Sequence, residues 1–183
     1  MGLPEDKFLI ALVGNRLDSE IEVDFVDVMK RMLEENGEIA FVIIGEINQA
    51  REKFVEDIFK GKIYYLGYCA NLIGTYNALN LYLNPKRLGG GFSAAMAIST
   101  GIPVVTLPNC DVAYNVGSEF VVNDFEEMID VVGRYASDSF YYEEKRMCAL
   151  NKKDKNTNEK MKEYVQDMLG EISKVMEDKN DSI

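Results

Sequence analysis

The segment from Asn84 to Val105 holds the residues of this chain best suited to bind an anion. Lys86 and Arg87 place two positive charges just before the consecutive glycines Gly89 to Gly91, and Ser93 follows as a candidate helix N-cap. A glycine loop that opens a helix presents free amide N–H groups and the positive helix end, which together suit a phosphate. A tight strand-to-helix turn without a ligand is the alternative, because the spacing matches neither a Walker loop nor a dinucleotide fingerprint.

Alternating strand and helix patterns position this segment. Short apolar runs, most of them closed by glycine or proline, predict buried strands, and apolar residues at helical spacing predict helices between them. The expected strands are Phe8–Val13, Ile39–Ile44, Ile63–Leu66, Leu79–Leu83, Pro103–Leu107 and Glu119–Val122. The expected helices are Phe25–Leu33, Phe54–Phe59, Leu72–Ala78, one after the glycine loop, and Phe125–Tyr135.

This order predicts an α/β fold, a doubly wound parallel sheet with C-terminal helices. In such sheets ligands bind beyond the carboxyl ends of the strands, so the loops after Val13, Ile44, Leu66 and Leu83 should converge on one cleft. We expect a single domain over residues 1–183, with a core of about 7–135 and a C-terminal helical segment of about 136–178.

The C-terminal segment carries its own helical signal. Asn156 and Glu159 resemble a capping box, and apolar residues recur at helical spacing from Met161 to Met176. This helix either packs on its own domain or contacts a partner domain, and the pattern alone allows both.

Composition restricts the classes of function. Lys and Arg total 20 and Asp and Glu total 31, a net charge of −11, which argues against a nucleic-acid binder. The chain has no histidine, which argues against the usual hydrolase triads, histidine bases and most zinc sites. Cys69, Cys110 and Cys148 show neither metal spacing nor a disulfide framework. With no signal peptide or transmembrane run, and with cysteines that fit a reducing compartment, we expect a cytoplasmic protein.

Three motifs in order resemble the C-terminal, donor-binding half of a GT-B-fold glycosyltransferase. They are Val13-Gly14-Asn15-Arg16-Leu17, Ile63-Tyr64-Tyr65-Leu66-Gly67-Tyr68, and Asn84-Pro85 through the glycines to Gly101-Ile102-Pro103-Val104-Val105. The likeness covers roughly residues 8–135. It implies a Rossmann-like half of a GT-B fold, a nucleoside-diphosphate sugar as donor, and an N-terminal domain that supplies the acceptor site and most catalytic groups.

The resemblance also implies roles for particular residues. Arg16 corresponds to the family arginine that neutralises the donor diphosphate. The backbone amides of the glycine loop would cradle the same phosphates, with Lys86 and Arg87 as basic neighbours, and Tyr68 to Asn71 would lie near the base. The loop residues concerned are Gly89, Gly90, Gly91, Phe92 and Ser93. Because arginine and helix amides would neutralise the diphosphate, the resemblance implies that no metal or other cofactor is needed. The catalytic residues, the sugar and the acceptor are left unassigned.

The chain departs from the family pattern at two positions. Many members carry two glutamates separated by seven residues, and the second binds the ribose hydroxyls, whereas this chain has Leu88 and Met96. Neither side chain accepts a hydrogen bond from a ribose, although a carboxylate such as Glu119 could substitute. A lysine that often follows the family arginine is also replaced by the Asp18 to Glu20 region.

The leading hypothesis is therefore the donor-binding half of a nucleotide-sugar-dependent glycosyltransferase, which we expect to be inactive in isolation. The alternative is a non-catalytic GT-B-like binding or chaperone module for a partner glycosyltransferase, which Leu88 and Met96 favour. An epimerase or phosphorylase relative is a third interpretation. A flavodoxin-like receiver or flavin domain is a fourth, and Arg16 argues against the receiver because a receiver carries acidic residues at that strand end.

Overall fold

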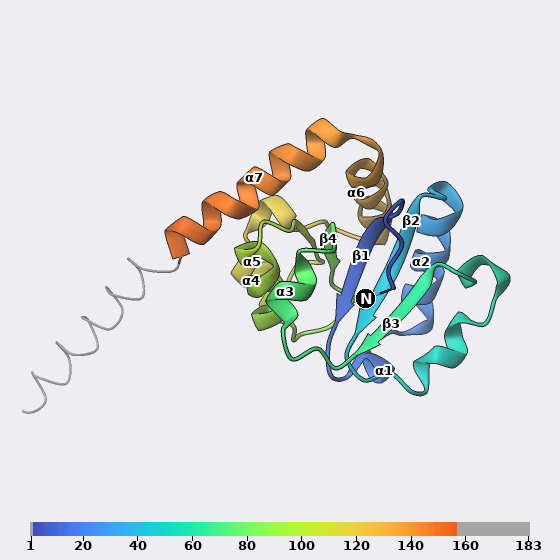
Figure 1. Cartoon of the computed structure of the whole chain (residues 1–183). Coiled ribbons are helices and arrows are strands. Elements are labelled where there is room, and N and C mark those ends of the chain that lie inside the picture. Colours follow the sequence, from blue (N-terminus) through green and yellow to red (C-terminus); the bar gives the residue numbers. More distant parts are fainter. Residues whose placement is uncertain (1, 157–183) are drawn as a thin grey trace, which may run out of the picture.

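The computed structural model describes residues 2–156 and contains a five-stranded, fully parallel sheet (Figure 1). The order across the sheet is β3-β2-β1-β4-β5, which confirms the α/β prediction. The strands are β1 (Phe8–Val13), β2 (Ile39–Ile44), β3 (Ile63–Gly67), β4 (Leu81–Leu83) and β5 (Val104–Val105). The predicted strand at Glu119–Val122 is wrong, because a 3₁₀ turn, η3 (Ser118–Phe120), lies there and Val121 makes one isolated bridge to Thr106.

Helices cover both faces of the sheet. On one face, Ile10 and Leu12 of β1 pack in a core with α2 (Val23–Glu35) and α6 (Phe125–Ser137). On the other face, Leu9 and Ala11 pack in a core to which α3 (Leu72–Tyr76), α4 (Gly91–Ser99) and α5 (Asp111–Val116) contribute. Because both faces are buried, the central strands are continuous apolar runs rather than alternating ones.

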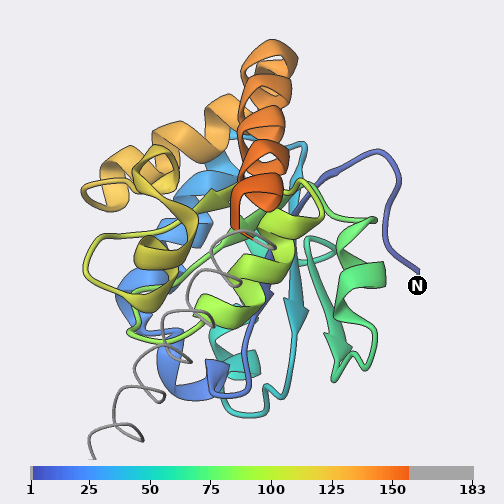
Figure 2. The same cartoon turned by 90° about the vertical axis from the view of Figure 1, so that its left-hand side faces the viewer.

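The last described helix, α7 (Ser139–Asn156), packs against α6 and α4, and Figure 2 shows it standing over α4. The sequence pattern predicted no individual helix at these residues within its C-terminal helical segment, because they are mostly polar and their apolar side chains do not form one strong stripe. The predicted helix from Met161 to Met176 lies outside the described residues. No helix within residues 2–156 is long and apolar enough to cross a membrane.

The predicted helix at Phe54–Phe59 is also wrong. Two 3₁₀ turns, η1 (Ala50–Phe54) and η2 (Asp57–Phe59), lie there, and Glu56 between them is extended. Phe54 and Phe59 pack edge to face with ring centroids 5.1 Å apart. On an α-helix, side chains five residues apart point about 140° apart, so this pairing requires the chain to break.

Candidate functional site

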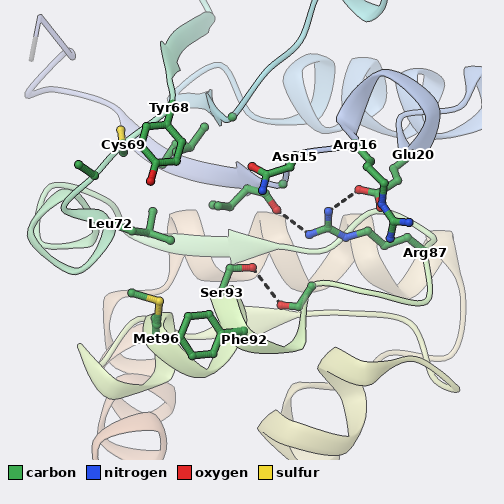
Figure 3. A pocket seen from close by; sticks show the side chains of 16 residues that line it. Asn15, Arg16, Glu20, Tyr68, Cys69, Leu72, Arg87, Phe92, Ser93 and Met96 are labelled. Atoms are coloured by element: carbon green, nitrogen blue, oxygen red, sulfur yellow. Dashed lines mark hydrogen bonds and ion pairs between the residues drawn. The ribbon is translucent and has the colours of Figure 1, made fainter.

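A cavity of about 500 Å³ lies beyond the carboxyl ends of β1, β2 and β3, at the N-terminus of α4 (Figure 3). Tyr68, Leu72, Phe92 and Met96 gather toward one end, and the charged side chains gather toward the other. The cavity therefore offers apolar surface for a ring and a charged end for an anion. The full lining is Val13, Gly14, Asn15, Arg16, Glu20, Ile44, Gly45, Tyr68, Cys69, Ala70, Leu72, Arg87, Gly90, Phe92, Ser93 and Met96.

The glycine loop opens α4 as expected, but with a different cap. Gly90 is the N-cap residue, with a left-handed φ of 98°, and Ala94 N donates the first helical hydrogen bond to Gly90 O at 3.1 Å. The amides of Gly91, Phe92 and Ser93 therefore precede the helical hydrogen-bond ladder. The prediction of Ser93 as N-cap is wrong, because its hydroxyl lies one turn inside the helix and donates to Gly90 O at 3.0 Å.

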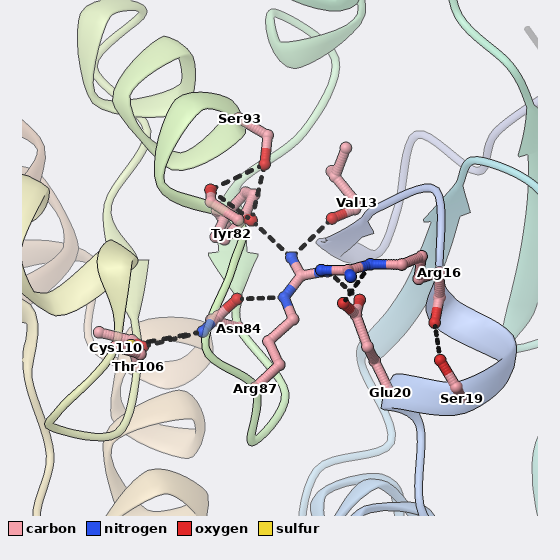
Figure 4. Close-up of polar contacts among 11 residues, drawn as sticks. Val13, Arg16, Ser19, Glu20, Tyr82, Asn84, Arg87, Ser93, Thr106 and Cys110 are labelled. Atoms are coloured by element: carbon pink, nitrogen blue, oxygen red, sulfur yellow. Dashed lines mark hydrogen bonds and ion pairs between the residues drawn. The ribbon is translucent and has the colours of Figure 1, made fainter.

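Arg87 is almost fully buried, with 4% of its side chain exposed, and joins three segments of the site (Figure 4). Its Nε donates to Asn84 Oδ1 at 2.8 Å, and Nη1 donates to Glu20 Oε2 at 2.5 Å. Its Nη2 donates to Val13 O at 2.7 Å and to Tyr82 Oη at 2.9 Å. The guanidinium thus ties the end of β1 to β4 and to the glycine loop that follows it.

The tyrosine in this network carries the connection into α4. Burial raises the pKa of the Tyr82 phenol, against the opposing effect of nearby Arg87, so the hydroxyl stays protonated. Tyr82 Oη accepts from Arg87 and lies 3.0 Å from Ser93 Oγ, and both hydroxyls are within hydrogen-bond distance of Gly90 O, at 3.4 and 3.0 Å. Tyr76 Oη donates to Ser93 O at 2.9 Å and fixes the same turn.

Arg16 is the solvent-accessible cation of the cavity, with 75% of its side chain exposed. Its Nε lies 3.6 Å from Glu20 Oε1, four residues on. A Cβ on Gly89 would lie 3.4 Å from Arg16 Nη2, so the arginine reaches across to the glycine loop. The two motifs that the sequence separates by about seventy residues therefore face each other.

The remaining predicted site residues are divided between the cavity and its surroundings. Tyr68 and Phe92 line the cavity at its apolar end. Lys86 lines a neighbouring cavity of about 370 Å³ between the loops after β4 and β5. Gly91 is buried against Asp111 and Asn115 of α5. Asn71 caps α3, with Oδ1 accepting from Gly74 N at 3.0 Å, and is not part of the cavity lining.

Sequence reasoning missed Glu20 as a cavity residue. Its signal was a carboxylate four residues after Arg16, on the same side of a short helix, α1 (Leu17–Glu20). Glu119, the suggested substitute for the missing glutamates, is not part of this lining and pairs with Lys152 at 3.1 Å. Within residues 2–156, no three His, Cys, Asp or Glu side chains cluster as a metal site would require. Independence from metal stays a prediction.

The family model for glycosyl transferases group 1 matches residues 8–138. The chain belongs to this family. Its sheet and flanking helices have the Rossmann-like fold of one half of a GT-B glycosyltransferase, and the match covers the residues that build the cavity. The comparison with curated proteins gave no match.

Solved structures of GT-B enzymes share the fold at low sequence identity. The Thermobaculum terrenum O-GlcNAc transferase is 20% identical with a TM-score of 0.71, covering 91% of this chain and 36% of its own. WaaG, a glycosyltransferase involved in lipopolysaccharide biosynthesis, is 18% identical with a TM-score of 0.68, and the match covers 86% of this chain and 45% of WaaG. An E. coli trehalose-6-phosphate structure bound with UDP-2-fluoro glucose is 17% identical with a TM-score of 0.68, and the match covers 89% of this chain and 44% of that one. The chain spans less than half the length of each.

Proposed function

We propose that this chain is the donor-binding half of a nucleotide-sugar-dependent glycosyltransferase. The observation that carries the proposal is the cavity in which Arg16 faces the N-terminus of α4. An exposed guanidinium and free helix amides fit a diphosphate, and the apolar end near Tyr68 and Phe92 fits the base and the sugar. The UDP-sugar held by one similar structure supports this ligand class.

The arrangement suits the departure of a nucleoside diphosphate. Negative charge grows on the diphosphate as the glycosidic bond breaks, and fixed donors at that point stabilise the transition state more than the ground state. Arg16 and the amides of Gly91 to Ser93 would provide these donors. Arg87 lies behind them as a second positive charge whose hydrogen bonds already hold the protein together.

A non-catalytic binding or chaperone module for a partner glycosyltransferase is the second candidate function. Met96 lines the cavity at a position where many family members have the ribose-binding glutamate, and Leu88 is exposed where they have the other. Both candidates require the same fold, but they differ in whether the cavity binds a nucleotide.

Calorimetric titration with UDP, GDP and their sugar conjugates distinguishes the two. The donor-site proposal expects micromolar to millimolar binding of one diphosphate, weakened at least about tenfold by Arg16→Ala because a charge-assisted contact is lost. Arg146→Ala is the matched control, since it removes an exposed arginine of α7 that pairs with Glu143 at 3.4 Å. If the folded chain bound none of these ligands, the non-catalytic module would become the better explanation.

A further inference from the structure

An acidic side chain lies inside the cavity proposed to hold a diphosphate. Glu20 is the one carboxylate among the described residues that line it, and 13% of its side chain is exposed. A negative charge at this place opposes an anionic ligand, so it lowers the affinity of the site unless another interaction compensates.

The two oxygens of Glu20 serve two different arginines (Figure 4). Oε2 accepts from Arg87 Nη1 at 2.5 Å, inside the buried network. Oε1 lies 3.6 Å from Arg16 Nε, at the solvent-exposed side of the cavity. If the first contact breaks, it leaves an uncompensated buried charge. The second contact is longer and its arginine is exposed, so it is weak and exchangeable.

We propose that Glu20 is an internal counter-ion that holds Arg16 until a diphosphate replaces it as the partner of that arginine. Glu20 then weakens the binding of free nucleoside diphosphate more than the binding of the sugar-linked donor. The inference rests on the proposed function. Arg87 fixes the carboxylate in the cavity, so Glu20 cannot swing away when the ligand arrives. The ligand therefore gains Arg16 but retains a nearby negative charge.

The selectivity follows from the charges of the two ligands. A terminal phosphate has a second pKa near 6, so at pH 8 a free nucleoside diphosphate carries about three negative charges and a nucleoside-diphosphate sugar about two. Arg16, Arg87 and Glu20 together contribute one net positive charge to the cavity. Because Coulomb energy scales with the product of the charges, the repulsion between Glu20 and the free diphosphate is about one and a half times the repulsion between Glu20 and the donor. Glu20 therefore reduces the preference of this net positive site for the free diphosphate over the donor, which eases release of the product.

The test is Glu20→Gln, titrated at pH 8 and low salt with UDP and UDP-glucose, or with GDP and GDP-mannose if the wild type binds the guanosine pair. Glutamine retains an oxygen that can accept from Arg87 but carries no charge to hold Arg16. We expect the free diphosphate to bind about tenfold more tightly and the sugar conjugate to gain by a smaller factor, because the direct repulsion that Glu20 exerts scales with the charge of the ligand. The gain should shrink as added salt screens the cavity.

Two further variants show whether Glu20 acts through Arg16. In the Arg16→Ala background, Glu20→Gln should tighten the free diphosphate by only about twofold, because only the direct repulsion of the ligand is then removed and no arginine remains to be released. Glu143→Gln, on the exposed face of α7, is the matched control and should leave both affinities unchanged.

Weaker or unchanged binding of both ligands to a folded Glu20→Gln protein would overturn the inference, and so would a full tenfold gain without Arg16. If the wild type bound neither pair, the proposed function itself would fail and this inference with it. If Glu20→Gln does not fold, Glu20→Asp is the substitute. It keeps a negative charge to balance Arg87, but the shorter side chain places the carboxylate farther from the ligand. A smaller gain with the same ligand preference is then expected, and no gain would overturn the inference.

Discussion

The backbones of Gly14 and Gly45 touch at the carboxyl ends of β1 and β2. Gly14 N donates to Ile44 O at 3.0 Å, and a Cβ added to Gly45 would overlap the carbonyl oxygen of Gly14. Gly45 also has a φ of 126°, which side chains rarely adopt. The floor of the cavity is therefore built from two glycines that leave no room for a side chain on Gly45.

Gly45→Ala should destabilise the protein by at least about 2 kcal/mol, because it combines a backbone clash with an unfavourable φ. Gly133→Ala is the matched control, since Gly133 lies on α6 with open space where its Cβ would be. That change should stabilise the protein by about 0.5–1 kcal/mol, as alanine favours a helix. Urea denaturation measures both, and equal effects would contradict the assigned contact.

Arg87→Met should lower the free energy of unfolding by about 3–5 kcal/mol, because it leaves the carboxylate of Glu20 without its buried partner. Arg146→Met, at the exposed pair on α7, should change it by less than about 0.5 kcal/mol. Thermal and chemical denaturation of the two variants provide the comparison. A loss below about 1 kcal/mol for Arg87→Met would mean that the network does not hold these segments together.

Asp18 links α1 to the segment that leads from β2 into η1. The amide of Ala50, and then those of Asn48 and Gln49, lower the pKa of its carboxyl below the ordinary 3.8 despite partial desolvation. A lowered folded pKa gives stability that is present above the unfolded pKa and is lost as the pH falls through the folded one. Stability should therefore fall below about pH 4, and Asp18→Asn should reduce this dependence.

The measurement is urea denaturation of wild type and Asp18→Asn from pH 7 to pH 2.5. Asp130→Asn, on the exposed surface of α6, is the control and should retain the wild-type dependence. An unchanged pH profile in Asp18→Asn would show that the hydrogen bonds to Asn48 and Ala50 do not persist in solution.

Met96→Glu restores the glutamate that many family members have on α4. If the cavity holds a nucleotide, the new carboxylate should accept hydrogen bonds from the ribose and tighten binding by about tenfold. Met147→Glu, on the exposed side of α7, adds the same charge away from the cavity and should have no such effect. Calorimetry measures the affinity of both variants for the nucleotide, and weaker binding to Met96→Glu would argue against a ribose at this position.

Much of the fold could be predicted from local patterns. The runs Phe8–Val13 and Ile39–Ile44 are apolar throughout, and the structure confirms both strands at those bounds. The prediction at Phe54–Phe59 failed because apolar residues at helical spacing belong there to two 3₁₀ turns, in which the two phenylalanines pack against each other. For α7, contacts with α4 and α6 outweigh the weak periodicity of its own sequence.

The candidate site divides in a similar way. The sequence by itself determined that Arg16 and the glycine loop follow strands, since glycine, cations and apolar runs are local features. Only the tertiary structure decided that Arg87 is buried against Glu20, 67 residues away, while Arg16 faces the cavity. The two arginines have the same side chain but different roles, because the direct pairing of β4 with β1 buries Arg87. That neighbourhood depends on the strand order of the whole sheet, which a local sequence pattern does not encode.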